Sequence, residues 1–231
     1  MKTERPNKAE GACLNTGDLR ALYQRLKKDI DARLAEFAAL WKNGTDAELW
    51  REFCFCTCTP QNDAKKADAA VARLDRDGLL AGGSPEKIAL GLRAGGVRFH
   101  NNKAAYIVRN RAMFFPDTKR HIQAAISGGE IGGETIEARN ALAKTVNGWG
   151  LKEASHFLRN IGFGGGLCIL DRHILRSLCS YGVLAEIPAS LTLSRYTEIE
   201  NSMLAFAKKT QIPPDALDLT FWFQAKGEIF K

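Results

Sequence analysis

The chain has 231 residues, 45% of them hydrophobic and 26% charged, and its formal net charge is +7. This length can bury a core in one domain or in two small ones. The positive charge suits a polyanionic partner without singling one out. No apolar run is long enough to span a membrane, and the polar residues 1–17 lack the apolar segment of a signal peptide. We therefore expect an intracellular protein with reduced cysteines and a flexible tail over residues 1–15.

Helical periodicity runs through almost the whole sequence. Apolar residues from Leu19 to Leu40 recur every three or four positions, which predicts a long first helix that ends at Asn43-Gly44. In chain order, the later helices are expected at about residues 46–58, 63–77, 85–94, 101–111, 118–126, 136–146, 151–160, 172–181, 195–210 and 214–224. A glycine-rich loop is expected at 127–133, and no alternating pattern longer than a few residues indicates a strand. The sequence therefore predicts an all-α fold.

Three cysteines, Cys54, Cys56 and Cys58, alternate along one of these helices. On a helix the first and third share a face while Cys56 points away, so three ligands could not surround one zinc ion. The sequence holds no C-x-x-C pair. We therefore interpret these cysteines as buried structural residues.

A Gly-x-Gly turn formed by Gly148, Trp149 and Gly150 separates two apolar helical segments. Glycines allow a tight turn and let backbone N–H groups approach a phosphate, and the following helix adds the positive end of its dipole. An ordinary helix–helix turn would also use glycines, so the turn alone does not decide between the two interpretations.

Lys152 follows in the first turn of the next helix, where it meets the positive end of the helix dipole. This field disfavours the charged ammonium, and a deprotonated amine is what imine chemistry requires. A solvated lysine that contacts a phosphate is an equally good interpretation of this residue alone.

Asp171 follows the glycines at 164–166 and an apolar run, and it opens the next helix. As an N-cap it needs no function. However, the glycine turn folds this helix back toward the helix of Lys152, so the two side chains could meet in one cleft. A carboxylate placed there could stabilise a cationic transition state.

Gly-x-Gly, then Lys152, then Asp171 19 positions later (171 − 152 = 19) resembles the helix-hairpin-helix superfamily of DNA glycosylases with lyase activity. The segments 150–160 and 171–175, supported by 98–108, 198–201 and 218–222, resemble its short, all-helical branch. That branch is the 8-oxoguanine DNA glycosylase/AP lyase of archaea and some bacteria. The resemblance covers about residues 50–231. It implies two helical lobes, residues 16–44 with 147–231 and residues 45–146, with the active site in the cleft between them.

The resemblance also implies a reaction and residues that carry it out. Lys152 would attack C1′ of a flipped 8-oxoguanine nucleotide, form a Schiff base and nick the strand by β-elimination, while Asp171 stabilises the sugar cation. The carboxylate of a C-terminal lysine, here Lys231, would read the lesion through the proton on N7. Trp222 could stack on the base, although core packing is its ordinary role. The other candidates for the base pocket are Phe99, Asp218 and His156.

Contacts to DNA are expected from the hairpin glycines Gly148 and Gly150 and from His173, which could equally be a packed or capping histidine. Gln61 or Asn62 lies where these glycosylases place a wedge that fills the hole left by the flipped base, although a polar helix start explains both. The expected partner is duplex DNA containing 8-oxoguanine, bound by a monomer in the cytoplasm or nucleoid.

No metal or organic cofactor is expected, although a monovalent cation could lie under the hairpin carbonyls. Some relatives carry a four-cysteine iron–sulfur cluster near the C-terminus, but no cysteine follows Cys179. Two other functions stay open. One is a glycosylase for oxidised pyrimidines or mispaired adenine, and the other is a non-catalytic DNA-binding module that uses the same hairpin.

Overall fold

The computed structural model describes residues 14–127 and 134–231, and every secondary-structure element in them is a helix. The predicted tail over 1–15 and the predicted loop at 127–133 lie almost entirely outside the described residues. In chain order the helices are α1 (Thr16–Asn43), α2 (Asp46–Cys58), α3 (Ala64–Arg76), α4 (Leu79–Gly82), α5 (Pro85–Ala94), α6 (His100–Phe114), α7 (Thr118–Ser127), α8 (Glu134–Thr145), α9 (Leu151–Asn160), α10 (Arg172–Ser180), α11 (Leu193–Thr210) and α12 (Pro214–Lys226).

Each predicted helix is present, with ends that differ by a few residues at most. Capping residues explain why the ends are so well marked. Thr45 and Glu48 form a reciprocal capping box at the start of α2, Asp63 caps α3, and Ser84 caps α5, which has proline in its first turn. The short helix α4 was not predicted. No helix in the described ranges combines the length and the apolar character needed to cross a membrane.

Two clusters of buried side chains form the interior. The first runs from Leu49 on α2 to Leu167 and contains the apolar face of α9. The second combines α1 with α10, α11 and α12, from Leu19 to Phe221. The buried residues of α9 therefore pack with the helices of residues 49–146. The predicted domain boundaries, which place α9 with the C-terminal helices, stay a prediction.

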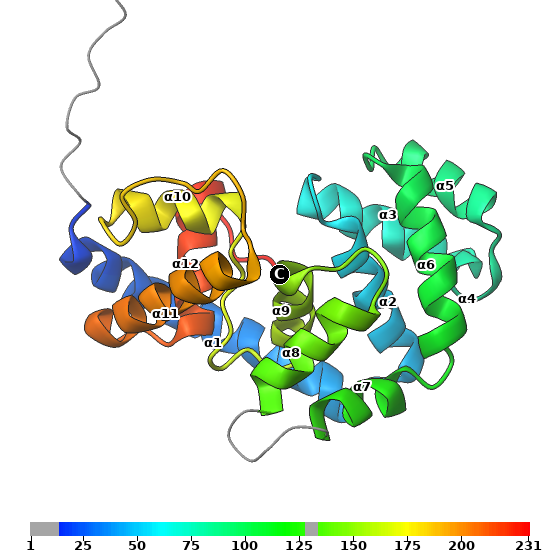
Figure 1. The fold of residues 1–231 in the computed structure, drawn as a ribbon, viewed down its shortest axis with the longest axis horizontal. Helices are drawn as coiled ribbons and strands as arrows, with labels where there is room; N and C mark the ends of the chain where they lie inside the picture. The colour runs from blue at the N-terminus through cyan, green and yellow to red at the C-terminus, as the bar shows by residue number, and fades with distance from the viewer. Residues whose placement is uncertain (1–13, 128–133) are drawn as a thin grey trace, which may run out of the picture.

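Two features join the halves. Helix α1 runs behind both of them and contacts α2, α9 and α12 (Figure 1). A buried ion pair links α8 to α11, because Arg139 Nη1 donates to both carboxylate oxygens of Glu200 at 2.7 and 2.6 Å. The chain ends between the two groups of helices, beside α9. Helix α9 thus lies at the centre of the molecule, and its first turn carries Lys152.

Candidate active site

The turn between α8 and α9 is held in place by contacts with α2 and α6. Trp149 is buried, stacks on Phe53 with ring centroids 4.3 Å apart, and donates from Nε1 to Thr57 Oγ1 at 2.9 Å. The Asn110 side chain accepts from Asn147 N at 2.9 Å and donates to Asn147 O at 3.0 Å. These bonds satisfy the polar groups of the turn on its inner side. The turn therefore presents Gly148 and Gly150, both exposed, on its outer side.

The two glycines have different reasons to be glycine. Gly148 has φ +83, and a Cβ there would lie 2.3 Å from the Tyr106 ring, so the fold itself requires glycine. Gly150 has φ −114, and its Cβ would meet only Glu153 Oε2, at 3.5 Å. Alanine would therefore fit at Gly150 without disturbing the turn. Glycine at this position therefore leaves open space on the outer side of the turn.

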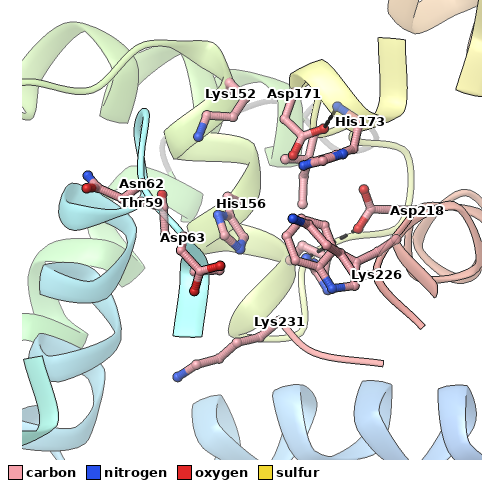
Figure 2. Close-up of a pocket in the computed structure, with 14 residues that line it drawn as sticks. Thr59, Asn62, Asp63, Lys152, His156, Asp171, His173, Asp218, Lys226 and Lys231 are labelled. Atoms are coloured by element: carbon pink, nitrogen blue, oxygen red, sulfur yellow. Dashed lines mark hydrogen bonds and ion pairs between the residues drawn. The ribbon is translucent and has the colours of Figure 1, made fainter. Parts of the chain in front are cut away.

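A cavity of about 100 Å³ opens next to this turn, among residues from α9, α12, the starts of α3 and α10, and the chain end. The sequence-predicted residues Lys152, His156, Asp171, His173, Asp218, Trp222, Lys231 and Asn62 all line it. Figure 2 shows Lys152, His156, Asp171, His173 and Asp218 around one space, to which segments far apart in the sequence contribute. The structure thus brings the proposed nucleophile, its proposed carboxylate partner and most of the proposed base pocket together.

Lys152 has an ion-pair partner that the sequence analysis did not identify. Its Nζ lies 3.0 Å from Glu153 Oε1, and the two side chains are 21% and 12% exposed. The other oxygen of Glu153 accepts from Gly150 N at 3.0 Å, so this carboxylate also caps the helix. Burial raises the pKa of Glu153, but the Lys152 charge and the bonds from Lys152 and Gly150 outweigh burial, and the net shift is downward.

Asp171 is an N-cap and also lies in the cavity. Its Oδ1 accepts from His173 N at 2.7 Å and from Ile174 N at 2.8 Å, which makes it the N-cap of α10. It lines the same cavity as Lys152. Because the cap uses Oδ1, the second carboxylate oxygen stays available to the cavity. The His173 ring meets the Trp222 ring edge-on, with centroids 5.4 Å apart.

Buried titratable groups form the floor of the cavity. Burial raises the pKa of Asp218 to about 6, although Arg159, whose Nη2 lies 3.3 Å away, opposes this shift. Burial also lowers the pKa of His156 well below its usual value, and the nearby cations Arg159, Lys152 and Lys231 lower it further. His156 is therefore a neutral imidazole at neutral pH, with one donor and one acceptor nitrogen.

The C-terminal residue is anchored by its own side chain. Lys231 Nζ lies 2.9 Å from Glu52 Oε2 and 2.8 Å from Asp68 Oδ1, and 4.4 Å from the centre of the Phe55 ring. Burial lowers the pKa of Lys231, but the two carboxylates outweigh burial and raise it above its ordinary value. The side chain thus reaches α2 and α3 while the residue lines the cavity (Figure 2).

In the loop between α2 and α3, Gln61 and Asn62 differ in their contacts. These are the two residues expected to fill the gap left by a flipped base. Asn62 Nδ2 donates to the carbonyls of Cys58 and Pro60, both at 2.9 Å, and Asn62 Oδ1 accepts from Arg98 N at 2.6 Å. The amide of Asn62 is therefore used to hold the loop. Gln61 is exposed at the tip with φ +57, an uncommon conformation for a residue other than glycine. Of the two residues, Gln61 is the more exposed.

Phe99 is the predicted pocket residue that the structure places elsewhere. It is 50% exposed, precedes α6 with φ +56, and does not line the cavity. It was proposed from the resemblance alone, and its role in stacking stays a prediction.

The cysteines on α2 are buried as expected. Burial raises the pKa of Cys54 and Cys56, and that of Cys58 to about 12, so all three are neutral thiols.

Comparisons with known proteins identify the family of this chain. The family described as 8-oxoguanine DNA glycosylase matches residues 30–212. The 8-oxoguanine DNA glycosylase/AP lyase of Fusobacterium nucleatum is 37% identical over 218 residues, which cover 93% of this chain and 96% of the relative. The protein of the same name from Methanocaldococcus jannaschii is 34% identical, with 89% of this chain and 93% of the relative covered.

Solved structures show the same fold. The crystal structure of the 8-oxoguanine DNA glycosylase of Thermotoga maritima matches with a TM-score of 0.82 and 30% identity, covering 94% of this chain and 98% of the other. The 8-oxoguanine glycosylase/lyase of Methanocaldococcus jannaschii, in complex with a 15mer DNA containing 8-oxoguanine, matches with a TM-score of 0.80 and 30% identity, covering 93% and 100%. The chain therefore belongs to the family of 8-oxoguanine DNA glycosylases with AP lyase activity.

Proposed function

We propose that this protein removes 8-oxoguanine from duplex DNA and then nicks the strand at the abasic site. The observation that carries the proposal is the cavity in which Lys152, Asp171 and Trp222 lie together beside the hairpin. The names of the relatives, and the relative bound to DNA containing 8-oxoguanine, support the choice of lesion. A glycosylase for oxidised pyrimidines or mispaired adenine would excise those bases instead when oligonucleotides carrying each lesion are compared.

The proposed reaction uses the geometry of the cavity. The flipped nucleotide enters it, the amine of Lys152 forms a bond to C1′, and the bond from C1′ to the base breaks. The free oxygen of Asp171 stabilises positive charge as it develops on the sugar. The base leaves with the proton that the attacking amine gives up. The sugar ring then opens: the C1′–O4′ bond breaks, O4′ takes up a proton from water, and a protonated imine joins Lys152 to C1′. This imine makes the proton on C2′ acidic, and its removal expels the 3′ phosphate. Because the lysine supplies both nucleophile and imine, the reaction needs no metal or organic cofactor.

Recognition of the base is proposed for the opposite side of the cavity. Trp222 offers a ring to stack on, and Asp218 and the neutral His156 offer an acceptor and a donor to the base edge. The carboxylate of Lys231 would accept from the N7 proton that 8-oxoguanine has and guanine lacks. A fixed acceptor facing guanine would instead meet the N7 lone pair, which disfavours the undamaged base.

Binding of the duplex is proposed for the hairpin and the α2–α3 loop. Gly148 and Gly150 would face a phosphate, His173 would contact another, and Gln61 would fill the gap left by the flipped base. A monovalent cation under the hairpin carbonyls stays part of the proposal. We further propose that the protein acts as a monomer, inside the cell where its DNA substrate lies, in the cytoplasm or nucleoid.

The Asp171→Asn variant tests the proposed catalytic role of the Asp171 carboxylate. Asparagine keeps a side-chain oxygen that can cap α10, so folding and DNA binding should change little. Loss of the preorganised charge should slow single-turnover excision of 8-oxoguanine by about 10²–10³. A variant that folds and keeps near-normal turnover would reduce Asp171 to a helix cap. A non-catalytic DNA-binding module predicts binding with no excision by any form of the protein.

A further inference from the structure

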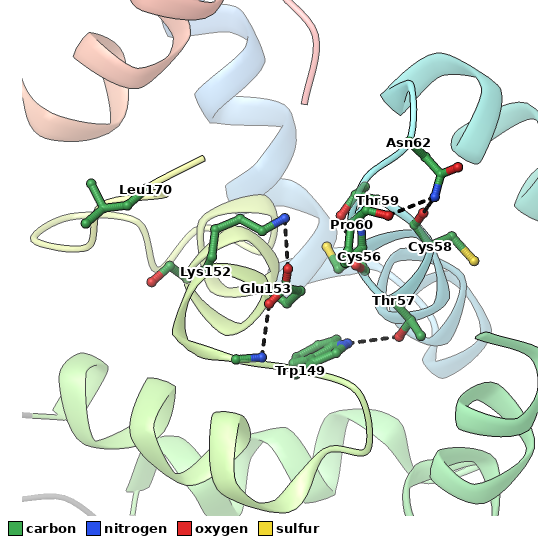
Figure 3. Close-up of polar contacts among 12 residues, drawn as sticks. Cys56, Thr57, Cys58, Thr59, Pro60, Asn62, Trp149, Lys152, Glu153 and Leu170 are labelled. Atoms are coloured by element: carbon green, nitrogen blue, oxygen red, sulfur yellow. Dashed lines mark hydrogen bonds and ion pairs between the residues drawn. The ribbon is translucent and has the colours of Figure 1, made fainter. Parts of the chain in front are cut away.

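The carboxylate of Glu153 lies between the candidate nucleophile and the phosphate-binding turn. One oxygen is 3.0 Å from Lys152 Nζ, and the other accepts from Gly150 N at 3.0 Å (Figure 3). Each contact uses a different oxygen, so the two can exist together. The pair is mostly shielded from solvent, with side-chain exposures of 21% and 12%. Electrostatic interactions are stronger in such a place than on an exposed surface.

The hydrogen bond from Gly150 N fixes the Glu153 carboxylate more firmly than an unbonded side chain would be fixed. Gly150 is the N-cap and Glu153 the third residue of α9, so the bond closes the first turn of the helix. Lys152 lies between them in the sequence and reaches back over the same turn. A counter-charge therefore stays at one place beside the amine, whichever rotamers the more distant residues adopt.

We propose that Glu153 is a positioning residue that controls the proton on Lys152, holding the side chain as an ammonium until the substrate displaces it from the pair. This inference rests on the proposed function, because it takes Lys152 to be the nucleophile. An ammonium has no lone pair and cannot attack C1′. At an abasic site the ammonium first gives one proton to water. The amine lone pair then adds to the C1′ aldehyde, and loss of one water leaves the imine.

The other charged or titratable groups around Lys152 do not provide an equivalent contact. In the described residues Glu153 is the acidic group within ion-pair distance of Nζ. The groups that face it from the surrounding elements are His156 and Arg159 on α9, Asp171 and His173 at the start of α10, Lys103 on α6, Asp63 before α3, Asp218 and Lys226 on α12, and the chain end at Lys231. All of them remain in place when Glu153 is changed. A shift in the pH profile therefore reports the loss of the Glu153 charge, which acts on Lys152 at 3.0 Å and, from beyond ion-pair distance, on Lys103.

The test is the pH dependence of imine formation, measured as borohydride-trapped complex with a duplex that carries a preformed abasic site. Glu153→Gln keeps an oxygen that can accept from Gly150 N, but it removes the negative charge. A carboxylate in contact with an amine stabilises its protonated form. We therefore expect the acid limb of the rate profile to move about one unit toward lower pH. Below that limb the variant should trap roughly tenfold faster than the wild type, with little change on the plateau.

The chain offers a matched control. Glu48 occupies the same position in the capping box of α2, where it accepts from Thr45 N at 2.8 Å. In the described residues no lysine lies within ion-pair distance of its carboxylate. Glu48→Gln should cost a similar amount of thermal stability and leave the acid limb where it is. Glu153→Asp restores the charge and should return the limb toward the wild-type position. A purely structural role would lower stability and plateau rate without moving the limb.

Two results are decisive in different ways. If the acid limb of Glu153→Gln stays in place or moves to higher pH, the inference about Glu153 is wrong, whatever happens to the plateau. If Lys152→Gln traps as well as the wild type, the proposed nucleophile is wrong and the proposed function fails first. A variant set in which Lys152→Gln abolishes trapping and Glu153→Gln shifts the limb supports both.

Discussion

The side chain of the last residue gives the sharpest prediction about recognition of the lesion. Lys231→Met keeps the terminal carboxylate but removes the ammonium that lies 2.9 Å from Glu52 and 2.8 Å from Asp68. A hydrogen bond to a charged group contributes about 1.5–3 kcal/mol. If one such bond of about 2 kcal/mol holds the chain end in the cavity, its loss lowers the equilibrium constant between the docked and undocked chain end by roughly 30-fold.

Excision of 8-oxoguanine should therefore fall by at least about tenfold in this variant. Cleavage at a preformed abasic site should change far less, because no base is left to be read. Single-turnover rates on the two substrates, measured in parallel, give the ratio directly. Deleting Lys231 should show the same selectivity, because it removes the side chain and moves the carboxylate.

A matched control removes a neighbouring ion pair that holds the same tail. Lys65→Met breaks the contact with Glu228, but Lys65 is 59% exposed, and exposed pairs contribute little. Its excision rate should stay within about threefold of the wild type, a limit chosen from that small contribution. The reasoning is refuted if Lys231→Met excises 8-oxoguanine normally, or if both of its reactions fall equally.

Three further predictions concern pH, the hairpin and stability. In the folded protein the pKa of Asp218 is raised to about 6, whereas in the unfolded chain it is near the ordinary value of 3.8. Between these two pH values the folded protein binds a proton that the unfolded chain releases. Unfolding measurements should therefore show the wild type gaining stability relative to Asp218→Asn as pH falls from about 6 toward 4. Gly150→Ala should fold normally and bind damaged and undamaged duplex more weakly, whereas Gly148→Ala should lose stability. If Gly150→Ala weakens binding to the damaged duplex alone, the turn belongs to the base pocket. Arg139→Met leaves the Glu200 charge buried without its partner, and it should lower the free energy of unfolding in urea by about 3–5 kcal/mol. The double variant Arg139→Met with Glu200→Leu should recover most of this loss. If the two losses instead add, the ion pair itself is not the cause.

The helices, and the meeting of Lys152 and Asp171 in one cavity, could be predicted because their signals are local. Start and stop residues such as Thr45 and Ser84 fix helix ends within a few positions. Lys152 and Asp171 each begin a helix beside a glycine turn, and two helix starts that face one cleft bring their side chains together. The four-residue helix α4 escaped prediction because so short a segment has no measurable period.

The contacts that complete the site depend on residues far apart in the chain. Lys231 pairs with Glu52, 179 positions earlier, and no periodicity or spacing reports such a distance. Arg159 was also missed, although it lies against Asp218 in the floor of the cavity. Glu153 could have been found, because glutamate three residues after an N-cap is the capping-box pattern. Its second contact, with Lys152, becomes visible only when the side chains are placed.

The central claim is that Lys152 forms the covalent bond to DNA. The most direct measurement is borohydride reduction during turnover of an 8-oxoguanine duplex, followed by proteolysis and mass spectrometry of the DNA-linked peptide. We predict a single modified residue, Lys152, and no adduct with Lys152→Gln although that variant still binds the duplex. An adduct on Lys103 or Lys231, or normal trapping by Lys152→Gln, would contradict the account.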